Sequence, residues 1–279
     1  MKLNALRKVG ALAAVSAVSV SVAVAGPNTP PPAETPPPAE MDAMGSIPPP
    51  PAGGSGGFWD SVGATLSVGY DSDYIFRGYD IGHDHVWTAL DLSVPLGDNI
   101  EASIGAWYTS AFNDGENELD VYASVAFDMG TWGLEVGYTN YSYPNGIIGD
   151  GSGNGGESNE AYVSVGTTLG PVDVALAYYY DFDLEISYVE ATAGTSIPLS
   201  SNVSLDPSVG ISYADIDNAP AGIEDSGFNH FFAKLELPIA LTPSATLTPY
   251  IATSVAQDVA EDRGEGDHFW GGIALSIDF

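Results

Sequence analysis

The stretch Phe-Trp-Gly-Gly-Ile-Ala-Leu-Ser-Ile-Asp-Phe at residues 269–279 decides the fold class. One face of this stretch would carry Phe269, Gly271, Ile273, Leu275, Ile277 and Phe279. The alternate positions hold Trp270 and then only small or polar residues, Gly272, Ala274, Ser276 and Asp278. Alternation with period two is the signature of a β-strand with one apolar face. Eleven residues also match the roughly 9–11 that a tilted transmembrane strand needs.

The same alternation recurs backwards along the chain to residue 58, and no segment shows a helical period of 3.6. It predicts twelve strands, near residues 62–70, 85–95, 100–110, 119–128, 132–143, 160–169, 172–182, 184–198, 203–216, 227–240, 245–257 and 269–279. In a regular eighth strand, Glu190 would lie on the same face as Ile186 and Tyr188. A charged residue on an otherwise apolar face predicts a bulge in this strand.

Short and long connections alternate along almost the whole chain. Tight links at residues 96–99, 129–131, 170–171, 199–202 and 242–245 separate longer polar links at 71–84, 111–118, 144–159, 217–226 and 258–266. Outer-membrane barrels have short periplasmic turns, longer external loops and an even strand number. We therefore predict an all-β fold, a single transmembrane antiparallel β-barrel of 12 strands over residues 58–279.

A soluble β-sandwich and a β-solenoid also use alternation, but neither predicts this rhythm of links or the aromatic residues near strand ends. An autotransporter translocator is disfavoured because no passenger and no pore helix precede the first strand. The terminal Phe279 resembles the recognition pattern of barrels delivered to the barrel-assembly machinery, which we expect as a partner along with outer-membrane lipid and lipopolysaccharide.

The first 57 residues differ from the rest of the chain. A basic segment with Lys2, Arg7 and Lys8, an apolar run at 11–24 and a small-residue site at 23–25 predict an export signal at 1–25. Residues 26–57 combine proline runs with a glycine-rich segment, which predicts a periplasmic linker without a core.

The charge balance excludes one class of partner. The sequence holds 37 acidic and six basic residues, and only Arg77, Lys234 and Arg263 lie beyond the predicted signal. Nucleic-acid binding needs clustered Lys and Arg, so we expect no nucleic acid as a partner. The oligomeric state is left open by the sequence.

Charged side chains within the strands are expected to face the lumen, the space that the barrel encloses, because charge on the lipid face is costly. The predicted lumen residues are Arg77, Asp91, Glu101, Asp128, Glu135, Asp173, Asp206, Lys234 and Glu236. Such an acidic lumen favours cations. The chain then serves as a channel for passive passage of small polar or cationic solutes, or as a structural, cell-wall-associated barrel without an open pore.

One motif follows the first strand. Ser72, Asp73, Tyr74, Phe76, Arg77 and Gly78 form a Ser-Asp-Tyr-x-Phe-Arg-Gly pattern that resembles the TorF-type family of outer-membrane porins of uncharacterised function, although Tyr79 and Asp80 depart from the family pattern. The resemblance implies a porin and names no substrate or catalytic residue. Independently, Arg77 is predicted either to pair bidentately with lumen carboxylates as a constriction or latch, or simply to pin its loop through an ion pair.

Other motifs point to weaker alternatives. His83, His85 and His268 are expected at the outer end of the barrel, where they form a candidate metal site. We predict no cofactor beyond Ca²⁺ or Mg²⁺ loosely bound at acidic external loops, including residues 114–120 and 261–267 and a calcium-loop-like start at 150–155. Ser226 lies near His230, but no triad spacing supports a lipid-modifying enzyme, so no catalytic residue is predicted.

Overall fold

The computed structural model describes residues 62–112, 117–144, 156–216 and 226–279. The predicted signal at 1–25, the predicted linker at 26–57 and the calcium-loop-like stretch at 150–155 lie outside these described residues. Among the described residues, no helix is both long and apolar enough to cross a membrane.

Strands make up almost all of the described chain. They are β1 (Gly63–Phe76), β2 (Tyr79–Gly97), β3 (Ile100–Ala111), β4 (Asn117–Asp128), β5 (Gly133–Tyr143), β6 (Gly156–Leu169), β7 (Val172–Asp181), β8 (Ile186–Gly194), β9 (Ile197–Ser200), β10 (Val203–Ile216), β11 (Ser226–Glu236), β12 (Ile239–Thr242), β13 (Ala245–Ala256) and β14 (His268–Asp278). One short helix, α2 (Asp258–Asp262), precedes β14.

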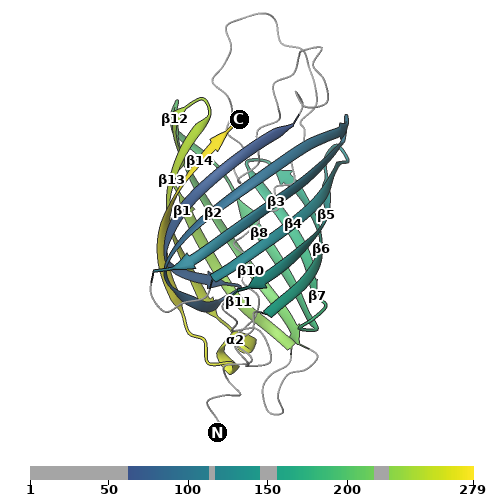
Figure 1. Ribbon diagram of the computed structural model, residues 1–279, viewed down its shortest axis with the longest axis vertical. Coiled ribbons are helices and arrows are strands. Elements are labelled where there is room, and N and C mark those ends of the chain that lie inside the picture. The colour runs from purple at the N-terminus through teal and green to yellow at the C-terminus, as the bar shows by residue number, and fades with distance from the viewer. Residues whose placement is uncertain (1–61, 113–116, 145–155, 217–225) are drawn as a thin grey trace, which may run out of the picture.

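The strands close into a barrel (Figure 1). Each strand pairs antiparallel with its neighbours along the chain, and β14 pairs with β1 from Asp278↔Thr65 to Gly272↔Asp71. The short strands β9 and β12 follow β8 and β11 after brief breaks and pair with β10 and β13. Counting each broken strand once gives the closed 12-stranded antiparallel barrel that the sequence predicts.

Prolines account for the break between β11 and β12. Pro238 follows Glu236 and Leu237, and a proline has no backbone N–H to donate to the sheet. Pairing is maintained around the break because the Leu237 N–H donates to the carbonyl of Pro249 at 3.0 Å and the Ser204 N–H donates to that of Pro238 at 3.2 Å.

The two faces of the sheet differ in chemistry. Large apolar side chains stand exposed on the outer face, among them Leu66, Leu90, Ile104, Val121 and Val209. On most strands the buried residues occupy the alternate positions and include many polar side chains, whereas on β1 and β11 the alternation changes where the register shifts. The wall therefore presents apolar groups outwards and polar and aromatic groups to the lumen.

The two ends of the barrel differ as well. The short-turn end carries the tight connections, and in Figure 1 it lies at the top with β12 and the C-terminus. The loop end carries the β1–β2 turn and α2 and lies at the bottom of that view. The buried apolar residues gather inside this loop end in two clusters, one around Tyr188 and Val259 and the other around Tyr74 and Trp107.

The predicted external loop at 71–84 is wrong. β1 and β2 continue through it and meet at a two-residue turn, in which Arg77 has φ 48° and Gly78 has φ 86°. Positive φ at both central positions is the type I′ geometry that matches the twist of a hairpin. A register shift between Tyr74 and Ile75 bends this extension.

The predicted bulge at Glu190 is also wrong. β8 pairs without a register shift with both β7 and β10, so Ile186, Tyr188 and Glu190 all face the lumen. The large apolar residues are accommodated there because the loop end is filled rather than open. Register shifts lie in other strand pairs, including β10 and β11, where the pairing shifts between Ile211 and Tyr213.

Candidate functional site

The β1–β2 turn reaches the opposite wall of the barrel through Arg77. The guanidinium donates from Nη1 to Glu160 Oε2 at 2.7 Å and from Nη2 to Glu160 Oε1 at 2.9 Å. The side chains of Arg77 and Glu160 are 9% and 2% exposed. Glu160 belongs to β6, which is separated from β1 by four strands in one direction around the barrel. The pair therefore spans the lumen.

Aromatic rings enclose the same guanidinium. Its central carbon lies 4.3 Å from the ring centre of Tyr188, 4.6 Å from that of Tyr179 and 4.7 Å from that of Phe76. Cations are attracted to ring faces at such distances, and more strongly when water is excluded. Glu160, Tyr179 and Tyr188 all belong to the wall, and we call these three residues the cation cage.

The backbone of the turn is held by β11. Asn229 donates from Nδ2 to the Arg77 carbonyl at 2.7 Å, and Tyr79 donates through its hydroxyl to Asn229 Oδ1 at 3.3 Å. A side chain at position 78 would place its Cβ 3.0 Å from Cγ of His230. Glycine is therefore required at Gly78 by both its φ and its close neighbour.

The rest of the hairpin tip, residues 74–81, packs beside a second carboxylate. Tyr74 and Tyr143 each donate a hydroxyl hydrogen bond to Glu118, at 3.1 Å in both cases. Tyr141 donates to Glu160 Oε1 at 3.0 Å. Glu118 and Glu160 are almost completely buried, at 0% and 1% exposed. Such burial is tolerated only where each carboxylate is hydrogen-bonded or paired.

Helix α2 completes the filling of the loop end. Val259 and Ala260 are 0% exposed and pack with Tyr79, Ile186 and Tyr188. The hairpin tip and α2 thus close the lumen at this end in the described conformation.

The predicted lumen residues lie on the face that carries the buried side chains, mostly towards the middle and the short-turn end. Tyr122 donates to Asp91 and Tyr162 to Glu135, both at 2.5 Å. Ser196 donates to Asp206 at 2.7 Å, Thr168 to Asp173 at 2.6 Å and the Gly130 N–H to Asp128 at 2.7 Å. Lys234 pairs with Glu236 at 2.7 Å, and Glu101 is half-buried on β3. Whether these residues line a conducting pore stays a prediction.

Sequence reasoning missed a repeated feature of the inner wall. Five glycines each face an aromatic ring directly across the sheet: Gly69 and Trp87, Gly105 and Tyr122, Gly137 and Tyr162, Gly210 and Phe232, and Gly272 and Tyr250. A Cβ on Gly105 would overlap the Tyr122 ring. The rings therefore lie flat on the wall. The sequence does contain a signal for this arrangement, because each glycine and its aromatic partner occupy lumen-facing positions on neighbouring strands.

The three candidate metal-binding histidines have separate partners. His83 Nδ1 lies 2.5 Å from Asp73, His85 Nδ1 lies 3.1 Å from Thr109, and His268 Nε2 lies 3.3 Å from Glu265. Over residues 62–112, 117–144, 156–216 and 226–279, no three His, Cys, Asp or Glu side chains are grouped to hold a metal ion. The arrangement gives no support to the predicted metal site.

One other sequence interpretation changes. Glu118 and Asp120, predicted in an acidic external loop, belong to β4 and are buried in the lumen at 0% and 1% exposed. His230 has its two ring nitrogens 3.0 Å from the Tyr188 hydroxyl and 2.8 Å from the Ser254 hydroxyl. These contacts do not support a catalytic pairing of His230 with Ser226.

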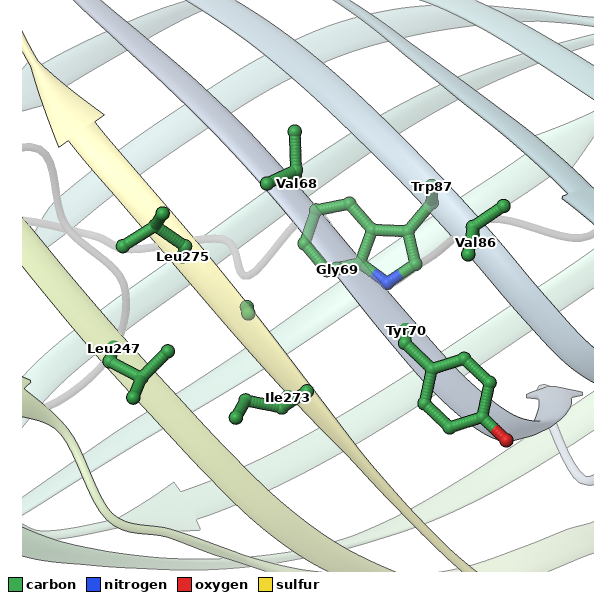
Figure 2. Close-up of a pocket in the computed structure, with 9 residues that line it drawn as sticks. Val68, Gly69, Tyr70, Val86, Trp87, Leu247, Ile273 and Leu275 are labelled. Atoms are coloured by element: carbon green, nitrogen blue, oxygen red, sulfur yellow. The ribbon is translucent and has the colours of Figure 1, made fainter.

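A shallow apolar depression of about 370 Å³ lies where the barrel closes, over β1, β2, β13 and β14. Figure 2 shows Val68, Val86, Leu247, Ile273 and Leu275 around it, with the Trp87 ring next to Gly69. Its lining is almost entirely apolar, and Val68, Val86 and Ile273 are exposed on the outer face. A polar solute would find no specific partner there, so we place the candidate site at the loop end.

The fold is a closed 12-stranded antiparallel β-barrel, an architecture that solved bacterial outer-membrane barrels share. Residues 56–234, more than half of the chain, match the family described as "Bacterial protein of unknown function (Gcw_chp)", and the chain belongs to this family. No curated protein matches the sequence. The TorF-type resemblance of residues 72–78 is not tested by these matches and stays a prediction.

Solved structures share the barrel at low sequence identity. The COG4313 outer membrane channel from Pseudomonas putida F1 is 14% identical, with a TM-score of 0.50 over 78% of this chain and 95% of that chain. The KdgM porin is 10% identical, with a TM-score of 0.48 over 77% and 99%. The translocator domain of the autotransporter NalP from Neisseria meningitidis is 12% identical, with a TM-score of 0.48 over 82% and 90%. The likeness concerns the fold.

Proposed function

We propose that this protein is an outer-membrane channel for passive passage of small polar or cationic solutes. The observation that carries the proposal is the division of the closed barrel into an apolar outer face and an inner wall lined with carboxylates. Because a bilayer satisfies no backbone hydrogen bonds, a closed barrel with an apolar exterior is suited to span it.

The charge of the inner wall supports preference for cations. Two bases that face the lumen form ion pairs, Arg77 with Glu160 and Lys234 with Glu236. Asp91, Glu101 and Glu135 lie outside both ion pairs and add negative charge to the wall. Negative side chains along a water-filled path raise the local cation concentration.

Bacterial outer-membrane localisation, lipid and lipopolysaccharide contacts and delivery by the barrel-assembly machinery belong to the same proposal. The outer band of exposed apolar residues and the terminal Phe279 support them, as does the porin family that the TorF-type motif resembles. In this orientation the loop end faces outwards, and the short-turn end faces the periplasm.

The filled loop end favours a second candidate, a structural barrel without an open pore. Glu118, Tyr141 and Glu160 are at most 1% exposed in that layer, so the described conformation leaves no water-filled path beside them. The channel and the structural barrel differ in one respect, which is whether the hairpin tip can move out of the filled loop end.

Single-channel recording tests the proposal. The chain would be refolded into planar bilayers, with heat-modifiable migration as the check of folding, and current measured in a KCl gradient. We expect brief openings with a reversal potential of the sign that indicates K⁺ preference. Folded protein that stays silent, both as wild type and with Arg77→Gly, would contradict the channel and leave the structural barrel.

A further inference from the structure

We infer that the cation cage, Glu160, Tyr179 and Tyr188, is a binding site for solutes that carry a guanidinium group. In the described conformation Arg77 occupies it as an internal ligand. This inference rests on the proposed function and deepens it, because it names the class of cation that the channel recognises.

The cage belongs to the barrel wall and not to the hairpin. Glu160, Tyr179 and Tyr188 come from β6, β7 and β8, which are consecutive paired strands. Within this wall, Tyr162 packs against Tyr179 with ring centres 5.6 Å apart, and Tyr179 against Tyr188 at 6.0 Å. The rings support one another and Tyr141 hydrogen-bonds Glu160 at 3.0 Å, so the cage is held by wall contacts that do not involve Arg77.

The geometry of the cage selects a planar cation. Both Glu160 oxygens accept from different nitrogens of one guanidinium, at 2.7 and 2.9 Å, while ring centres lie 4.3 and 4.6 Å from its carbon. A guanidinium presents parallel N–H donors and stacks on rings, whereas an ammonium is a compact, strongly hydrated charge that lacks this fork.

The surrounding charge makes the cage dependent on a cation. Tyr188 also donates to Glu190 at 3.0 Å, and Asp120 and Asp181 are buried nearby in the same filled end, at 1% and 2% exposed. Oδ1 of Asp120 is buried without a hydrogen-bond partner among the described residues. Arg77 supplies positive charge to this cluster through its pairing with Glu160. Without that charge, Glu160 is left as a buried carboxylate with no cationic partner, which is strongly unfavourable.

Because Arg77 occupies the cation cage, binding of a solute to the cage is coupled to opening of the loop end. A solute guanidinium and Arg77 compete for the same atoms of Glu160, so solute binding releases the hairpin tip from the opposite wall. A ligand that binds only the released state shifts the population towards it. The loop end would then open in response to the solute that passes.

The experiment removes the Arg77 side chain from the cation cage and supplies a free guanidinium compound in its place. Arg77→Gly removes the side chain and suits the φ of 48° at this turn position. The variant would be refolded in detergent, and its thermal unfolding midpoint measured with methylguanidinium chloride at millimolar concentration, well below denaturing levels. Methylammonium chloride at equal concentration is the matched control.

We expect methylguanidinium to raise the midpoint of Arg77→Gly and methylammonium to have little effect. In Arg77→Gly/Glu160→Gln the apparent affinity for methylguanidinium should fall at least about tenfold, because the cage loses its charge. Equal shifts by the two cations, or an unchanged effect in the double variant, would overturn the inference.

A second measurement covers the case in which Arg77→Gly does not fold. Wild-type protein would be titrated with the same two cations while hydrogen exchange of residues 74–81 is followed. If methylguanidinium competes with Arg77, it should speed up amide exchange in the hairpin tip, whereas methylammonium should not. Equal exchange rates with the two cations would overturn the inference. Both readouts are independent of conductance, so a silent channel with a working cage would contradict only the proposed function.

Discussion

Arg77 combines a strained backbone conformation with a buried ion pair. It is a bulky residue with a positive φ of 48°, and its side chain is 9% exposed with both terminal nitrogens bonded to one carboxylate. A left-handed conformation costs a non-glycine residue about 1–2 kcal/mol. The side chain must therefore contribute more than the strain costs, which points to the pairing with Glu160 as the reason for arginine at this position.

Arg77→Lys tests that pairing at the level of one hydrogen bond. The charge is kept, but the second parallel bond to Glu160 is lost. We expect the free energy of unfolding to fall by about 1–3 kcal/mol in urea titrations of the refolded barrel. Lys234→Ala is the control: its ion pair is about one third exposed, at 36% and 30%, so its loss should cost under about 1 kcal/mol. Equal losses would show that burial of the Arg77 pair contributes nothing.

The glycines beneath the inner aromatic rings give a second prediction at this scale. A Cβ on Gly105 would overlap the Tyr122 ring, so Gly105→Ala must displace a ring that also hydrogen-bonds Asp91. We expect a loss of about 1–3 kcal/mol in the same urea titration. Gly97→Ala is the matched control, since a Cβ at this position would have no neighbour within 4 Å, and it should change stability by under about 0.5 kcal/mol.

At the scale of elements, the hairpin tip is held by a small number of contacts to β11. Asn229 bonds the Arg77 carbonyl at 2.7 Å and accepts from Tyr79 at 3.3 Å. Asn229→Ala should therefore loosen residues 74–81 without opening the rest of the barrel. We expect amide exchange in that segment to rise about tenfold, measured by mass spectrometry.

Asn202→Ala is the control for that experiment. Asn202 lies on an exposed turn at the other end and makes a side-chain bond of 3.4 Å to the Ala240 carbonyl. It should leave the exchange of residues 74–81 unchanged. Faster exchange throughout the barrel with Asn229→Ala would indicate that Asn229 supports the whole barrel and not the hairpin tip.

The same hairpin shows what sequence patterning can and cannot predict. Strands with regular alternation, such as β4, β5 and β14, appear within a few residues of their predicted bounds because one face is consistently apolar. Residues 71–84 contain several aspartates and two glycines, which are typical of a loop. Their strand conformation depends on tertiary contacts of Tyr74, Phe76 and Arg77 with strands far away in the sequence, and local patterning does not contain that information.

At the scale of the whole molecule, the alternating pattern predicts whether a carboxylate faces the lumen, but it does not predict which residue hydrogen-bonds to that carboxylate. It places Asp91 and Glu135 on the inner face, yet their tyrosine donors, Tyr122 and Tyr162, follow only from the strand register. The pattern around the start of β4 indicates a loop because glycine and acidic residues adjoin it. Patterning also gives no sign of Glu160 as the partner of Arg77, because the pair is 83 residues apart and crosses the lumen.

The uneven burial of the inner carboxylates makes a prediction about selectivity. Glu118 and Glu160 are sealed in the loop end, whereas Glu101 and Glu236 are half-buried on the remaining wall, where ions in transit would meet them. Glu101→Gln/Glu236→Gln should therefore lower the ratio of K⁺ to Cl⁻ permeability, measured from reversal potentials. The loss should be clear at about 0.1 M KCl, where charges act over about 10 Å, and small at about 1 M, where they act over about 3 Å. Asp98→Asn, on the exposed turn between β2 and β3, should leave the ratio unchanged. If the double variant and Asp98→Asn behave alike at low salt, the inner wall does not set the selectivity, and the field of the acidic lumen is no basis for cation preference.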